Sequence, residues 1–219
     1  MPKTLLGFCL SLLLACTQAP TTVHEAAVPE QDQRQAFARI ADLARHKDLQ
    51  EMRVDDIGWD DFVDQYTALD STSFKVLWPD SNWVAGVGDY DHTFVHGWKE
   101  LDKEHVLLSL ITMGEDSYCI TIVCDLRARD GRSLGTFDAA ERCGDGGWTY
   151  DAHGRFDGAW SFVRTSLETD MQAVDSNYVE TYACDSVVDR ISFAPKGGLK
   201  YEQISANHFE RVEHPQAQD

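Results

Sequence analysis

The chain has 219 residues, with 37 Asp and Glu against 19 Lys and Arg, which gives a formal net charge of −18 at pH 7. Nucleic acids and anionic lipid headgroups are bound by cationic patches, so this charge argues against both as ligands of the folded part. After residue 16 the longest apolar run, Val106 to Met113, is too short to cross a bilayer as a helix, and about 200 residues remain for a domain with a core.

The first sixteen residues have the pattern of an export signal. Lys3 precedes an almost unbroken apolar stretch from Leu5 to Leu14, which is followed by Ala15 and Cys16. A basic start, an apolar centre and a small residue at the cleavage point are typical of signal peptides. The ending Leu-Leu-Ala-Cys resembles the lipobox of bacterial lipoproteins, and the resemblance covers about these sixteen residues only.

This resemblance implies that residues 1–15 are removed and that Cys16 carries the lipid. Two or three acyl chains would hold the protein at a membrane, because each buried methylene contributes about 0.8 kcal/mol. Thr17 stands where many inner-membrane lipoproteins carry Asp, so the resemblance favours an outer-membrane location. Residues 16–31 are polar, contain two prolines and show no periodicity, and we expect a flexible tether.

The next segment, residues 32–70, carries helical periodicity. Asp32 and Gln35 form a capping-box pattern, and apolar residues follow at helical spacing. A second short helix is expected between Trp59 and Tyr66, where apolar residues again recur at intervals of three and four. We therefore expect a helical segment ahead of the main domain.

Residues 71–219 change to alternating polarity, with β-branched and aromatic residues between Gly and Asp turns. The segments predicted to form strands are Phe74–Trp78, Val106–Met113, Tyr118–Leu126, Leu134–Asp138, Trp148–Phe156, Trp160–Glu168, Tyr178–Phe193 with an interruption, and Leu199–Phe209. Short turns at Asp130-Gly131, Asp157-Gly158 and Pro195–Gly198 make sequence neighbours antiparallel. The predicted fold is mainly β: an antiparallel meander that closes as a barrel, a sandwich or a strongly curved sheet.

Four cysteines fall in the folded part: Cys119, Cys124, Cys143 and Cys184. An even number of cysteines in an exported protein favours disulfides, and no C-x-x-C pair indicates a metal site. All three connectivities remain open on this count alone.

The Asp130-Gly131 turn bears on one possible bridge. It makes facing residues sum to 261, so Cys119 lies opposite Arg142 rather than Cys143. A Cys119–Cys143 bridge would then need a β-bulge or a slip near Gly144.

Metal ligands gather between Asp89 and His96. On a strand, His92 and His96 would stand about 13 Å apart, which is too far for one ion. Asp89 and Asp91 remain as candidate ligands of a loop calcium site, and no other cofactor is expected.

Other candidate chemistry is sparse. The run Cys143–Gly147 resembles the nucleophile loop of chymotrypsin-like proteases, but Gly146 stands where the serine should be, so no catalytic residue is assigned. Of six tryptophans, Trp83 and Trp98 lie in a glycine-containing region and are the candidate pair for stacking against a sugar ring.

These observations favour a non-enzymatic envelope lipoprotein that binds another protein or a surface polymer. The alternatives are a glycan hydrolase with paired carboxylates and a carbohydrate- or calcium-dependent binding module. The oligomeric state is left open.

Overall fold

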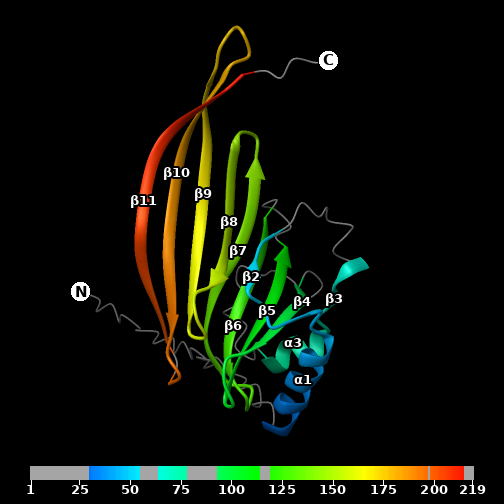
Figure 1. The fold of residues 1–219 in the computed structure, drawn as a ribbon. Coiled ribbons are helices and arrows are strands. Elements are labelled where there is room, and N and C mark those ends of the chain that lie inside the picture. The colour runs from blue at the N-terminus through cyan, green and yellow to red at the C-terminus, as the bar shows by residue number, and fades with distance from the viewer. Residues whose placement is uncertain (1–29, 55–63, 78–92, 114–118, 197, 215–219) are drawn as a thin grey trace, which may run out of the picture.

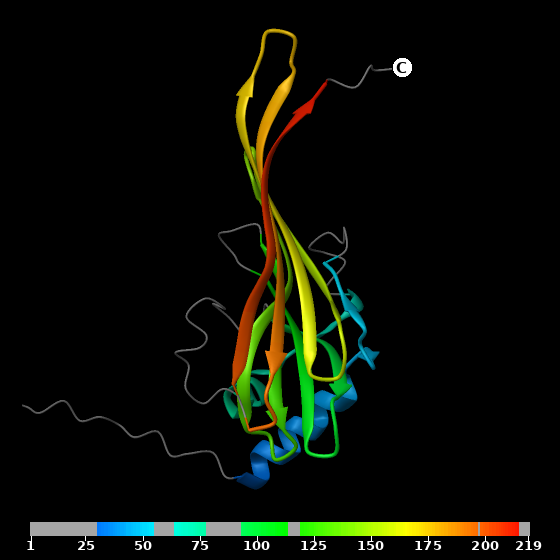
Figure 2. The ribbon, with the colours of Figure 1, turned by 60° about the vertical axis from the view of Figure 1, so that its left-hand side comes forward.

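The computed structural model describes residues 30–54, 64–77, 93–113, 119–196 and 198–214. Its main feature is one sheet of eleven strands in the order β1-β4-β5-β6-β7-β8-β9-β10-β11, with β2 paired to β8 and β3 to β4 (Figure 1). The order ends at β11 without returning to β1, so the sheet is open, and its long strands bend and twist along their length (Figures 1 and 2). The predicted mainly β fold with an antiparallel meander is confirmed.

The eight long strands follow one another along the chain, and each pairs antiparallel with the next. They are β4 (Thr93–Glu100), β5 (His105–Met113), β6 (Ile120–Ala128), β7 (Ser133–Asp145), β8 (Trp148–Phe156), β9 (Ser161–Val174), β10 (Glu180–Phe193) and β11 (Leu199–Glu213). The three predicted hairpin turns join β6 to β7, β8 to β9 and β10 to β11. Strand β10 runs on without the predicted interruption.

Two helices, α1 (Glu30–Leu43) and α3 (Ser71–Leu77), lie beside each other near β4 (Figure 1). The apolar positions Phe37, Ile40 and Ala44 recur at helical spacing and are buried against the sheet. Within the described part of the chain, neither helix has the length and apolar character needed to cross a membrane.

Helix α3 corrects the strand predicted at Phe74–Trp78. Asp70 caps the helix: its carboxylate accepts hydrogen bonds from the Ser73 backbone N–H at 2.8 Å and from the Ser73 hydroxyl at 2.7 Å. Phe74 and Leu77, three residues apart, then share the buried side. The cap outweighs the β propensity of this short apolar run.

The segment 32–70, predicted to be helical, also contains three strands of two residues each. They are β1 (His46–Lys47), β2 (Glu51–Met52) and β3 (Thr67–Ala68), and β1 pairs parallel with β4. Leu49 and Met52 are buried in the core, and this burial holds residues 46–52 against the sheet in an extended conformation instead of a helix. Most of the second expected helix lies outside the described residues.

Apolar cores cover both faces of the sheet around β5, every residue of which is buried. One core packs α1 and α3 on Val106, Leu108 and Leu110. The other core contains Leu107 and Ile111 with side chains from β2, β6, β7, β9 and β10. Strand β5 is therefore the centre of the packed half of the molecule.

A buried ion pair fastens the helical layer to the sheet. The Arg127 Nε donates to the Asp125 carboxylate at 2.7 Å, one terminal nitrogen donates to the carbonyl of Leu77 at 2.8 Å, and the other donates to the carbonyl of Gly131. Ser133 donates to the second Asp125 oxygen at 2.6 Å. Both charges are thus satisfied within the fold.

The other half of the sheet is far less covered. In β11, thirteen of fifteen residues are exposed, among them Tyr201, Ile204, Phe209 and Val212. Strand β8 pairs with β9 only as far as Asp170, so the outer ends of β9 to β11 project beyond the rest of the sheet (Figure 2).

Candidate functional site

Several residues singled out from the sequence lie outside the described residues. These are Cys16, Trp83, Asp89, Asp91 and His92. The lipid attachment site and the calcium ligands therefore stay predictions.

Trp98 is half-buried on β4, and its ring packs on Phe37 of α1, with ring centroids 4.9 Å apart. Its remaining surface lines a hollow of about 600 Å³ between α1 and β4. Charged groups of both signs surround this hollow, including Lys47, Asp48 and Arg129. Trp98 thus packs on α1 and presents the rest of its ring to the hollow, and its stacking against a ligand stays a prediction.

His96 lies in a buried polar cluster. Its Nδ1 is 2.9 Å from the Ser109 hydroxyl, and its ring centroid is 4.9 Å from that of His46, which in turn is hydrogen-bonded to Tyr66 at 3.3 Å. Burial, followed by the nearby His46, lowers the pKa of His96 to about 3. A neutral, hydrogen-bonded histidine of this kind fits a structural role.

Cys119 and Cys143 form a disulfide, whereas Cys124 and Cys184 are free and buried. The predicted register holds over Val123–Leu126, with Cys124 opposite Phe137, although beside the turn Arg127 faces Ser133, one residue out of that register. A β-bulge between Ile122 and Val123 then shifts the pairing by one residue. This bulge brings the two cysteines opposite each other, as the bridge required, but five residues away from Gly144.

Around the disulfide and across strands β7 to β11, one face of the sheet is acidic. Side chains in register across neighbouring strands point to the same side of a sheet, as do residues two apart along a strand. Three adjacent rows of five residues meet this condition. They are Glu141-Ala152-Ser166-Val187-Ala206, Cys143-Tyr150-Glu168-Asp185-His208 and Asp145-Trp148-Asp170-Ala183-Glu210.

We call these fifteen residues the acidic platform. Six carry carboxylates and none is Lys or Arg. All the carboxylates are exposed except that of Glu141, which is half-buried. The nearest cation on the same face, Arg164 in the row below, lies 3.5 Å from Asp189.

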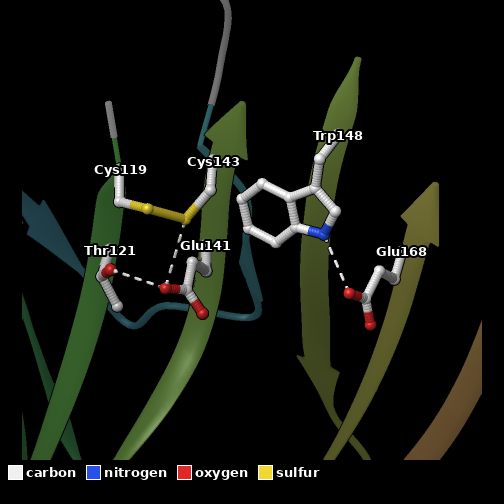
Figure 3. The surroundings of a disulfide bond; sticks show 6 residues. All are labelled: Cys119, Thr121, Glu141, Cys143, Trp148 and Glu168. Carbon is white, nitrogen blue, oxygen red and sulfur yellow. Dashed lines mark hydrogen bonds between the residues drawn. A yellow bond between two sulfur atoms is a disulfide. The ribbon is translucent and has the colours of Figure 1, made fainter. Parts of the chain in front are cut away.

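Figure 3 shows the part of the platform beside the disulfide. The indole N–H of Trp148 donates to Glu168 at 2.8 Å, and the Thr121 hydroxyl donates to Glu141 at 3.3 Å. The Glu141 carboxylate also lies 3.5 Å from the Cys143 sulfur. Burial, and then the charge of Asp138, raise the pKa of Glu141 above its usual range.

The disulfide decides against a metal at this point. Within the described ranges, Cys119, Glu141 and Cys143 are the one group of three potential ligand side chains, with ligand atoms within 4.8 Å of one another. Because the two sulfurs are bonded to each other, they offer no thiolate to an ion.

Neighbouring carboxylates of the platform lie at the spacing that glycosidases use. Glu168 directly faces Asp185 across β9 and β10 and precedes Asp170 by two residues on β9, which is about 5 to 7 Å in each case. Paired carboxyl groups in glycosidases stand about 5 to 10 Å apart, so the glycan-hydrolase alternative stays a prediction. Carboxylates beside Trp148 and Tyr150 also suit a cationic group, which is attracted by both the charges and the ring faces.

Sequence reasoning missed this platform. A signal exists, because carboxylates two residues apart in β9, Glu168 and Asp170, must share a face. Aligning them with the other four strands of the platform requires the registers of four hairpins.

Comparison with known proteins adds no relatives, because no family model, curated protein or solved structure matches this chain.

Proposed function

We propose that this protein is a non-enzymatic binding component of a bacterial cell envelope, held at a membrane by lipid on Cys16, and that the acidic platform captures a partner with a cationic surface segment. The observation that carries the proposal is the platform itself: six carboxylates, five of them exposed, beside two half-buried aromatic rings, with no Lys or Arg among its fifteen residues. A net charge of −18 adds a field that attracts cations from a distance.

The geometry favours a protein over a small ligand. Three rows across five strands make a broad surface about 20 Å wide, given about 4.8 Å between strands. A surface of this extent can contact a protein along several strands, whereas small molecules bind in enclosed pockets. The half-buried rings of Trp148 and Tyr150 supply the aromatic contacts that such interfaces favour.

Site-specific photo-crosslinking in intact envelopes tests the proposal. A photoreactive residue in place of Tyr150 or Ala183, on the platform, should yield crosslinks to one partner, and one in place of Lys103, in the β4–β5 loop, should not. Replacing Glu168 and Asp170 by Lys should abolish these crosslinks, while the matched change of the exposed carboxylates Asp130 and Glu202 should leave them. Equal crosslinking from all positions, or from both pairs of variants, would refute platform binding.

The tether is tested separately. Cys16→Ala should release the chain from membranes and abolish incorporation of an alkyne-labelled fatty acid, because the thiol is the acylated group. Retention at the membrane together with unchanged labelling would exclude lipidation at Cys16.

A further inference from the structure

The outer edge of β11 is free among the described strands. Its inner edge pairs with β10, and a β-bulge at Ile204 interrupts the pairing between Gln203 and Ser205. Beyond the bulge the pairing is regular over Ser205–Glu213. All of these nine residues are exposed except Arg211, which is half-buried. A regular, exposed edge of this length is a template for another strand.

We infer that a second copy of this chain pairs antiparallel with this edge, with Phe209 opposite Phe209 of the second copy. In a symmetric antiparallel pair one residue must face its own counterpart, because the two-fold axis keeps each side chain on the same face. Phe209 is the midpoint of Ser205–Glu213, so centring on it uses all nine residues. Centring on His208 or Glu210 would set two imidazoles or two carboxylates against each other and would pair only seven residues of each chain.

The residues brought together by this register are complementary. His208 meets Glu210 of the second copy, and Ala206 meets Val212, each pair occurring twice. Asn207 meets Arg211, and no two like charges face each other directly. Within its own chain His208 is hydrogen-bonded at 2.9 Å to Asp185 of β10, so it stands between a carboxylate on its inner side and Glu210 of the second copy on its outer side.

The pairing would also enlarge the acidic platform, and this consequence rests on the proposed function. A two-fold axis perpendicular to the sheet leaves both platforms on the same face of one continuous sheet. The two chains, each with net charge −18, repel one another. Salt screens this repulsion beyond about 8 Å at physiological ionic strength, whereas the edge contacts lie within it. Because the edge is short, we expect a micromolar or weaker dimer.

Sedimentation of the full chain over a range of concentrations gives the first test. Phe209→Lys sets two cations against each other on the axis and should weaken the dimer by roughly tenfold or more. Tyr201→Lys is the matched control: Tyr201 is an exposed aromatic residue on β11 but lies before the bulge, so its change should alter the dissociation constant less than about twofold. A chain that stays monomeric at millimolar concentration, or equal effects of the two variants, would overturn the inference.

Disulfide trapping tests the register. Mixing chains that carry Ala206→Cys with chains that carry Val212→Cys should give an intermolecular disulfide on mild oxidation, because these positions face each other. Tyr201→Cys mixed with Val212→Cys should not, and the buried native thiols are common to both mixtures. Equal trapping in the two mixtures would contradict the register. If platform crosslinks persist in a chain that is strictly monomeric, only the dimer inference is refuted. If the dimer is trapped but the platform gives no crosslinks, only the proposed function is refuted.

Discussion

His96 is the residue whose protonation the fold opposes most clearly. Its pKa is lowered to about 3 by burial and by His46, against 6.5 for a free histidine. The folded protein therefore holds the neutral ring, and the unfolded chain takes up a proton below pH 6.5. Stability from this residue is complete above pH 6.5 and is lost as the pH falls towards 3.

We expect His96 alone to lower the unfolding free energy by about 2 kcal/mol between pH 8 and pH 5. His96→Gln keeps a polar partner for Ser109 but does not titrate, so its stability should fall less over that range. Urea unfolding of both proteins at pH 8, 6.5 and 5 measures the difference, in which all other groups cancel. Parallel pH curves would contradict the assignment.

Arg127 is the second residue with a large expected effect. Arg127→Met leaves the Asp125 carboxylate buried without its cation and should cost about 3 to 5 kcal/mol. Arg127→Lys should recover little of this, because a single ammonium cannot reach Asp125, Gly131 and Leu77 together.

The control for Arg127 lies on the same hairpin. Arg129 pairs with Glu100 at 2.9 Å, but both side chains are exposed, so Arg129→Met should cost less than about 1 kcal/mol. Chemical denaturation of the three variants decides the matter. Similar losses for Arg127→Met and Arg129→Met would show that the buried pair does not fasten the helices to the sheet.

At the scale of elements, the disulfide joins β6 to β7 across the bulge. It closes a loop with a sequence separation of 24, and removing it with Cys119→Ala and Cys143→Ala should cost about 3 kcal/mol. A reducing agent should destabilise the natural chain by a similar amount and leave the double variant unchanged. Thermal unfolding with and without the reductant measures both effects.

The two free cysteines provide an internal check. Cys124 and Cys184 are buried, and burial raises the pKa of the Cys124 thiol well above its usual range. Alkylation of the native, unreduced chain that carries Cys9→Ala and Cys16→Ala should therefore label neither buried thiol, and denaturation should expose two. Labelling of Cys119 or Cys143 without reductant would contradict the bridge.

The hairpins show how much of the strand pairing can be predicted from the sequence. The Asp130-Gly131 turn predicts the β6–β7 register correctly only over Val123–Leu126. The pairing is shifted by one residue beside the turn, where Arg127 faces Ser133, and again at the bulge at Ala139, which carries no signal of its own. With Asp157-Gly158 as a two-residue turn, the numbers of facing residues on β8 and β9 would add up to 315. In the structure Trp148 faces Asp170, so these numbers add up to 318 and β9 is displaced by three residues. The loop runs on to Ser161, whose carbonyl accepts from the Asp157 N–H at 2.9 Å.

This error of three explains why the acidic platform could not be derived from the sequence. An odd shift moves every side chain of β9 to the opposite face, so Glu168 and Asp170 would have been placed away from Trp148 and Tyr150. Strand positions follow from local polarity and turn residues, but the alignment of five strands depends on loop lengths and bulges that tertiary packing selects.

For the whole molecule, burial falls across the sheet from β5 to β11. Every residue of β5 is buried between two apolar cores, whereas thirteen of fifteen residues of β11 are exposed. Stability is therefore uneven, since amides in packed strands open only with global unfolding and those at a bare edge open locally. A single two-state free energy of unfolding therefore describes the packed strands around β5 better than the exposed strands around β11.

Hydrogen exchange of the full chain makes this gradient measurable. At low protein concentration, amides of β5 and β6 should exchange slowest and those of β11 fastest, because only one edge of β11 is paired. At high concentration, exchange should slow over residues 205–213 but not over 199–203, because the bulge at Ile204 separates the regular edge from the rest of the strand. Uniform protection across β5 and β11 at low concentration would contradict the burial gradient, and concentration-independent exchange at 205–213 would leave that edge to a different partner.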